Sequence, residues 1–136
     1  MIPKFRAWHH ELSRMMLIRT MFFFANELEE LQLNDSIMND DIPVYPDEIE
    51  LMQSTGLRDK NGKEIFEGDI VTAGDVTSDI KYHQTLGYYM IGKYGFSVPF
   101  GQGVDVEYFE EFADHVSKIF EVIGNIYENP ELLEVE

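Results

Sequence analysis

Short apolar runs separated by polar residues and glycines make up most of the chain, a pattern that favours strands over long helices. Residues 2–8 (IPKFRAW) and 14–24 (RMMLIRTMFFF) are rich in β-branched and aromatic residues, with the polar HHELS between them. We expect two strands joined by a short loop. Residues 79–100 (DIKYHQTLGYYMIGKYGFSVPF) combine strand formers with glycines, which predicts a meander of short strands. Residues 118–127 (KIFEVIGNIY) predict a further strand.

Helical signals are fewer. Residues 26–34 (NELEELQLN) predict a short helix with Asn26 as its N-cap, and residues 107–116 (EYFEEFADHV) place apolar side chains at helical spacing. Near the end of the sequence, Asn129 is expected to cap a helical turn that begins at Pro130. The pattern as a whole predicts a mainly β fold of short strands with one or two short helices, and an α+β fold is the alternative.

Residues 34–50 are acidic and contain Pro43 and Pro46. Proline has no backbone N–H group and cannot continue a helix, so a regular helix is excluded here and a central strand is disfavoured. We expect a loop or an edge segment.

Two turn signals lie close together in residues 54–71 (STGLRDKNGKEIFEGDIV). Asn61 and Gly62 tolerate the positive φ that both central residues of a type I′ turn require, so we expect the chain to reverse there. Gly68 and Asp69 predict a second turn, followed by a strand that ends at Gly74.

The composition excludes several classes of protein. Hydrophobic residues make up 44% of the chain and aromatic residues 13%, enough apolar surface for a globular core. The chain has no cysteine, which rules out disulfides, thiolate metal sites and a cysteine nucleophile, and which fits a reducing cytoplasm. The apolar run at residues 21–25 (MFFFA) is too short for a membrane span or a signal sequence, so we expect a soluble protein.

The net charge of -16 is distributed unevenly, with nine acidic and no basic residues at positions 26–50. Such a field repels phosphate backbones and makes nucleic acid an improbable partner. The exception is the basic start of the chain. We expect its four basic side chains to point to solvent or to the acidic segments; they are Lys4, Arg6, Arg14 and Arg19.

The known catalytic and nucleotide-binding motifs are incomplete or absent in the sequence. Residues 87–93 (GYYMIGK) match most of a phosphate-binding loop, but Tyr94 replaces the required serine or threonine, and we interpret the run as a strand. Gly101 and Gly103 begin a dinucleotide-binding pattern that Val106 breaks, so we expect a turn. No serine lies in a G-x-S-x-G elbow, and 26 carboxylates do not single out a catalytic pair. We predict no catalytic residue and no cofactor.

The four histidines show no short metal-ligand spacing, and no metal is predicted. We expect His9 and His10 in an exposed loop, and His83 and His115 on partly buried faces of a strand or helix. Whether the four meet in a metal site in three dimensions stays open at this point.

Three blocks of sequence together resemble the YopX family of phage and prophage proteins: IPKFRAW at residues 2–8, LMQSTGLRDKNGKEIFEGDIV at residues 51–71 and FEVIGNIYENPELL at residues 120–133. There are two small departures from the family pattern. Ser54 stands where the family often has an aromatic residue, and His9 and His10 replace the usual, more charged turn after the tryptophan. The residues that carry the family signature in these blocks are Asn61, Gly62, Gly68, Asp69, Gly124, Asn125, Asn129 and Pro130.

The resemblance implies a protein that is encoded by a phage or prophage and acts in the cytoplasm of the bacterial host. It also implies an SH3-like barrel in the second half of the chain. We therefore expect a β-rich lobe with the acidic proline-containing segment at residues 1–50, and a barrel-like C-terminal domain at residues 51–136. The family has no established activity, so the resemblance transfers no catalytic residue.

Three functions follow as hypotheses. The first is a non-enzymatic, self-associating interaction protein that binds itself and a host or phage protein, because the chain is rich in aromatic residues and a β-rich fold has edges that must be covered. The second is an acidic mimic of nucleic acid that occupies a basic host protein. The third is a small barrel that binds nucleic acid through the basic N-terminal strands. An enzyme is not expected.

Overall fold

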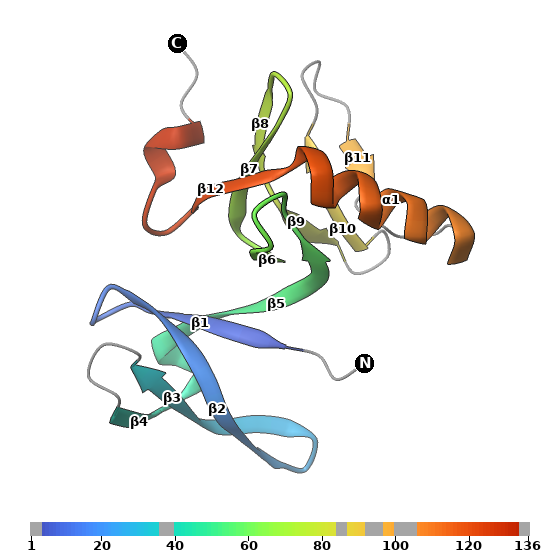
Figure 1. Cartoon of the computed structure of the whole chain (residues 1–136). Helices are drawn as coiled ribbons and strands as arrows, with labels where there is room; N and C mark the ends of the chain where they lie inside the picture. The colour runs from blue at the N-terminus through green and yellow to red at the C-terminus, as the bar shows by residue number, and fades with distance from the viewer. Residues whose placement is uncertain (1–3, 36–39, 84–86, 92–96, 100–105, 134–136) are drawn as a thin grey trace. The chain divides into compact units, whose positions relative to one another are not determined.

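The computed structural model describes residues 4–35, 40–83, 87–91, 97–99 and 106–133, and it divides the chain into two compact units, Met1–Gln53 and Ser54–Glu136. Antiparallel strands dominate both units, which confirms the mainly β prediction (Figure 1). Each unit has a hydrophobic core of its own.

The first unit is an antiparallel sheet with the strand order β4-β3-β2-β1-β5. Its core contains Ala7, Met16, Leu31, Leu33, Val44 and Ile49. The elements are β1 (Phe5–His9), β2 (Arg14–Phe24), β3 (Glu27–Asp35), β4 (Asp40–Val44), the 3-10 helix η1 (Pro46–Glu48) and the first part of β5 (Ile49–Arg58). The strand expected at residues 14–24 has these same bounds.

The helix expected at residues 26–34 is wrong, because this segment is strand β3. Phe24 pairs with Glu27, and the two residues between them, Ala25 and Asn26, have φ of 52° and 68°. Two consecutive residues with positive φ are typical of a type I′ hairpin turn. The buried side chains of Leu31 and Leu33 then alternate with more exposed neighbours, a period of two that lets β3 cover the core.

The acidic proline-containing segment forms the edge of this sheet, as the prolines indicate. Pro43 lies in β4 opposite Gln32, and β4 has only β3 as a described neighbour. Pro46 is the first residue of η1. Proline at an edge leaves no ladder hydrogen bond unmade, because its missing N–H group would have faced away from the sheet.

The second unit consists of two three-stranded antiparallel sheets, β12-β7-β8 and β11-β10-β9, together with the pair formed by β6 and the end of β5. The elements are β6 (Glu64–Phe66), β7 (Asp69–Ala73), β8 (Val76–Asp79), β9 (Lys81–His83), β10 (Gly87–Ile91), β11 (Ser97–Pro99), α1 (Val106–Ile119), β12 (Glu121–Asn125) and the 3-10 helix η2 (Pro130–Leu133). The expected meander is confirmed by the β9-β10-β11 sheet. No ladder among the described strands closes the unit into a barrel, so the SH3-like detail stays a prediction.

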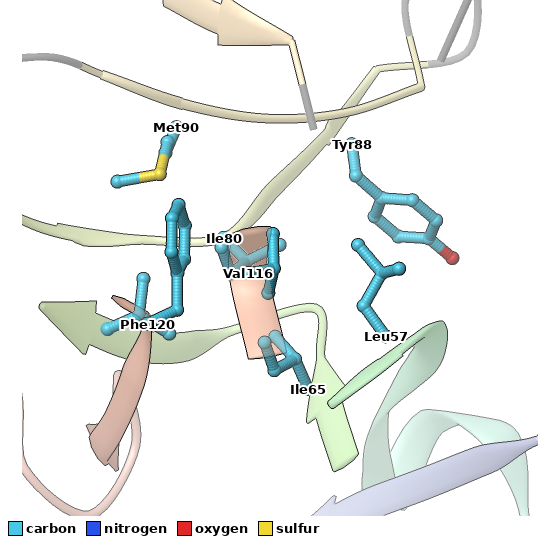
Figure 2. Packing of buried hydrophobic residues seen from close by; sticks show 8 residues of the cluster. Leu57, Ile65, Ile80, Tyr88, Met90, Val116 and Phe120 are labelled. Atoms are coloured by element: carbon cyan, nitrogen blue, oxygen red, sulfur yellow. The ribbon is translucent and has the colours of Figure 1, made fainter. Parts of the chain in front are cut away.

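The core of the second unit lies between these strands and α1 (Figure 2). Val116 on the helix is fully buried, and Phe120 directly after the helix packs into the same cluster. The helix ends later than residue 116 and includes Lys118, which the sequence placed in a strand. Lys118 lies 2.8 Å from the Asp114 carboxylate one helical turn earlier. The cluster contains Leu57, Ile65, Val71, Ile80, Tyr88, Met90, Val116 and Phe120.

The hairpin after β5 reverses at the expected place but with different backbone geometry. Gly62 has φ of 80°, whereas Asn61 does not have positive φ, so the type I′ prediction is wrong. The Gly62 N–H group donates to the Asp59 carbonyl, and the Asp59 N–H group donates to the Lys63 carbonyl. This is the pattern of a four-residue turn, residues 59–62, whose last residue is left-handed, a geometry that needs glycine at a single position.

Replacing Gly62 by valine is expected to lower the free energy of unfolding by about 1 kcal/mol or more, because a β-branched residue is strained at positive φ. A Cβ atom at Gly62 would have no heavy atom within 4 Å, so the cost comes from the backbone alone. Gly62→Asn is the matched control and should cost less, since asparagine tolerates this conformation. Thermal unfolding measures both, and equal melting temperatures for the two variants would contradict the assignment.

Candidate functional site

The centre of the second unit's signature region is Asp59, which directly follows β5 and is only 2% exposed. Its Oδ1 atom accepts hydrogen bonds from the N–H groups of Asn61, at 2.9 Å, and Lys63, at 2.8 Å. Its Oδ2 atom accepts one from the Val122 N–H group at 2.9 Å. One carboxylate therefore shapes the turn and also joins it to β12.

These hydrogen bonds determine the ionisation of Asp59. Burial by itself would raise the pKa of this carboxyl, but the N–H groups of Val122, Lys63 and Asn61 favour its charged form, and the pKa lies below the ordinary value of 3.8. The carboxylate is thus ionised at neutral pH, and its acceptor positions are directed at the backbone of its own unit. This is the arrangement of a structural carboxylate.

The second turn has similar chemistry. Asp69 is 1% exposed, and its Oδ2 atom accepts a hydrogen bond from the Phe66 N–H group at 2.8 Å. Gly68 has φ of 85°; its N–H group donates to the Ile80 carbonyl, and its carbonyl accepts from the Ile126 N–H group. Gly68 therefore joins the turn to the residues directly after β8 and β12, and Asp69 joins it to the end of β6.

The C-terminal signature residues form a compact turn after β12. Asn125 is buried, and its Oδ1 atom accepts hydrogen bonds from the N–H groups of Tyr127 and Glu128. Asn129 directly precedes η2, at the expected N-cap position, and its carbonyl accepts a hydrogen bond from the Leu132 N–H group at 3.1 Å, while its Oδ1 atom accepts from the Asn125 N–H group at 3.3 Å. Pro130 is the first residue of η2, as the sequence indicates.

Gly124 is adjacent to this turn for a steric reason. A Cβ atom at this position would lie 2.5 Å from the Asn129 Oδ1 atom and 2.9 Å from the Asn129 Cβ atom. The φ of Gly124 is outside the left-handed region, so close packing and not backbone conformation requires glycine. The eight signature residues thus belong to separate turns of one unit.

Tyr88 is a second titratable group with a displaced pKa. Burial raises the pKa of its phenol to about 12, with a further contribution from the negative charge of Glu67. Its hydroxyl donates to the Ser54 carbonyl at 3.2 Å. A phenol held in its neutral form and hydrogen-bonded to the backbone stabilises the fold of this unit.

Two of the histidine expectations are wrong. His9 is the last residue of β1 and is 5% exposed, and its Nδ1 atom accepts a hydrogen bond from the Leu12 N–H group at 3.1 Å. His115 is exposed on α1 and contacts the Phe120 ring edge-on. His10 is exposed as expected, while the side chain of His83 lies outside the described residues. Within the described ranges, no three potential metal-ligating side chains come together.

The basic start of the chain behaves mostly as expected. Lys4 and Arg14 are exposed, and the Arg19 Nε atom lies 2.9 Å from the carboxylate of Asp41 in the acidic segment. Arg6 is the exception because it is only 8% exposed. It lies in β1 between β2 and β5, with Leu17 and Met52 as its cross-strand neighbours.

Two segments that partly match nucleotide-binding patterns, residues 87–93 and 101–106, are described only in part. Residues 87–91 form strand β10, paired with β9 and β11, which confirms the strand interpretation. The turn expected at residues 101–103 lies outside the described residues. In the described parts of the chain, no helix is long and apolar enough to span a membrane.

The candidate functional site is an exposed apolar surface on the first unit. We call Phe22, Phe23 and Phe24 the phenylalanine tip; they are 45%, 63% and 70% exposed, respectively. They end strand β2 directly before the type I′ turn. Three consecutive exposed phenylalanines are unusual for a protein surface, and such exposure commonly marks a site of association.

The tip is exposed because the neighbouring strands stop short of it. On one side β1 pairs with β2 only as far as Leu17, and on the other side β4 pairs with β3 only from Leu31 onward. The end of the hairpin is therefore a two-stranded ribbon in the described part of the sheet (Figure 1). Among the described residues, no further strand pairs with either edge of this ribbon.

Fold and surface define a two-unit, mainly β protein whose candidate site is an exposed aromatic ribbon. The YopX protein family model matches residues 4–134, and the chain belongs to this family. Its structure is similar to the crystal structure of protein EF1440 from Enterococcus faecalis, with a TM-score of 0.62 and 27% sequence identity. That match covers 98% of this chain and 99% of the other. No curated protein matches the chain.

Proposed function

We propose that the protein is a non-enzymatic, self-associating interaction protein, encoded by a phage or prophage and acting in the cytoplasm of a bacterial host. The observation that carries this proposal is the phenylalanine tip, which presents three large apolar side chains on a ribbon with open edges. Aromatic side chains dominate the energy of many protein interfaces, because they bury a large area with few rotatable bonds.

The chemistry of the signature residues supports a structural role for them. The buried Asp69 carboxylate and the Asn125 side chain accept hydrogen bonds from backbone N–H groups near them in sequence. Asp59, which lies beside the signature residues Asn61 and Gly62, does the same and also accepts from the distant Val122 N–H group. These polar atoms stabilise turns. The family signature therefore maintains the second unit, and the binding function belongs to the first.

Self-association predicts that light scattering will give a multiple of the 15.8 kDa chain mass for the purified protein. Replacing Phe23 and Phe24 together by serine should shift the mass toward that of one chain. Leu17→Ser is a matched control, because Leu17 is 58% exposed on the same strand but outside the tip. A wild-type protein that remains one chain at every concentration, and that binds no host protein, would contradict the proposal.

A second candidate, an acidic decoy for a basic host protein, is favoured by the acidic outer strands of the first unit. The exposed carboxylates include Glu27 and Glu29 on β3 and Asp40 and Asp41 on β4. Binding of this kind would weaken steeply with added salt, whereas apolar association through the tip would not. Titration with salt therefore separates the two candidates.

A further inference from the structure

The open edge of β2 differs in character from the other open edges of the first unit. Residues 20–24 of β2 (TMFFF) contain no charged side chain. The facing part of β3 contains Glu27, Glu29 and Glu30, and edge strand β4 contains Pro43. Like charges would repel two copies of β3, and proline interrupts hydrogen bonding along β4. Of these three edges, as far as the structure describes them, the β2 edge is the one that suits a second copy of itself.

The alternation of side chains along this edge is regular. The β2–β3 ladder contains two bulges. The first falls between Ile18 and Thr20, before residues 20–24, and the second, opposite Phe22 and Phe23, has its additional residue on β3 and not on β2. On residues 20–24 of β2, side chains therefore alternate between the two faces. Thr20, Phe22 and Phe24 share one face, while Met21, which packs against the core, and Phe23 share the other.

We propose that two copies of the chain associate by antiparallel pairing of their β2 edges across a two-fold axis at Phe22. This inference rests on the proposed self-association and names its interface. In this register Phe22 lies opposite its own copy, Met21 lies opposite Phe23, and Thr20 lies opposite Phe24. Facing residues of antiparallel strands share a face, so each phenylalanine meets an aromatic, thioether or β-branched partner, all of which are favourable cross-strand pairs.

Cysteine cross-linking tests this register, because the chain contains no native cysteine. Facing Cα atoms in antiparallel strands are about 4.5–5.5 Å apart, within the span of about 4.4–6.8 Å that a disulfide allows. Phe22→Cys should therefore give disulfide-linked dimers under mild oxidation. Phe23→Cys is the matched control: Phe23 is more exposed than Phe22, 63% against 45%, but the register places it opposite Met21.

We expect the Phe22→Cys variant to cross-link about tenfold faster than Phe23→Cys, since its thiols are held together at a high effective concentration. If exposure of the thiol alone decided the rate, Phe23→Cys would cross-link faster than Phe22→Cys. A mixture of Thr20→Cys and Phe24→Cys chains retains Phe22 and should form the mixed dimer in preference to either single species. If Phe22→Cys does not fold, this mixture decides the register by itself.

The outcomes separate this inference from the proposed function. An oligomer by light scattering in which Phe22→Cys cross-links no faster than Phe23→Cys, or in which the mixed dimer is not preferred, overturns the β2 interface and leaves self-association in place. A wild-type protein that is a single chain overturns both. Preferential cross-linking at Phe22, together with a dimeric wild type, supports both.

Discussion

Replacing Asp59 by alanine is expected to lower the free energy of unfolding of the second unit by about 3 kcal/mol, because a buried N–H group left without an acceptor costs about 1–3 kcal/mol. Three N–H groups lose their partner, those of Asn61, Lys63 and Val122. Asn61 and Lys63 are exposed, so water can replace part of what they lose. Val122 is more enclosed and should account for most of the loss.

Hydrogen exchange along β12, residues 121–125, and urea unfolding followed by circular dichroism measure this effect. Asp59→Asn is the matched control: its carbonyl can still accept from the turn, but its amide nitrogen cannot accept from Val122. It should therefore retain more stability than the alanine variant while still increasing exchange in β12. Unchanged exchange in both variants would show that the carboxylate does not join the turn to this strand.

The ionisation of Asp59 gives the direction of a pH effect. The pKa of its carboxyl is lower in the folded chain than the ordinary 3.8, so the folded state binds this proton less readily than the unfolded state. The stabilisation is therefore complete above the unfolded value and is lost as the pH falls through the lower, folded value. The stability difference between wild type and Asp59→Ala should accordingly narrow on acidification below pH 3.8. A difference that stays constant there would contradict this assignment.

Gly124→Ala is expected to destabilise the second unit by about 2 kcal/mol, a typical cost of forcing an extra methyl group into a packed site. The new Cβ atom would lie within 2.9 Å of three atoms of the Asn129 side chain, namely Oδ1, Cγ and Cβ. Rotation of the amide alone does not remove such a contact. The Asn129 side chain must move and lose its hydrogen bond to the Asn125 N–H group.

A double-mutant cycle with Asn129→Ala tests this explanation. Asn129→Ala loses the same hydrogen bond but also removes the Oδ1 and Cγ atoms that lie closest to the new methyl group, and only the contact with the Asn129 Cβ atom at 2.9 Å remains. The double variant should therefore be more stable than the sum of the two single effects by about 1 kcal/mol or more, a coupling typical of residues in direct contact. Additive effects in urea unfolding would show that the clash at Gly124 has another origin.

Much of the fold could be predicted from the sequence because strand signals are local. The apolar and aromatic run at residues 14–24 gave the bounds of β2, and the prolines at positions 43 and 46 identified an edge. Residues 26–34 were assigned incorrectly because two leucines at helical spacing also suit a strand once the ladder contains a bulge. Pairing with β2 and β4 decided between the two, and pairing between strands is not visible in a single segment.

The candidate site was less accessible to sequence reasoning. A run of three phenylalanines resembles a buried strand, and its exposure depends on where β1 and β4 stop, which is a property of the assembled sheet. Asp59 was missed as well. Aspartate two residues before Asn61-Gly62 is a usual first residue of a turn, so a local signal existed, but its bond to Val122 joins residues 63 positions apart.

The separation of 63 positions between Asp59 and Val122 also affects the order in which the chain can fold during synthesis. The ribosome releases the N-terminal end first, so the whole first unit is available for pairing while much of the second is still unmade. The hairpin at Asp59 must wait for Val122 before its carboxylate is fully bonded. The hydrogen bond of Asp59 therefore makes completion of the second unit depend on β12, which is translated long after the turn, whereas the phenylalanine tip is exposed early. Under the proposed self-association, premature association of nascent chains on one messenger RNA would involve the tip, and replacing Phe23 and Phe24 together by serine should reduce it.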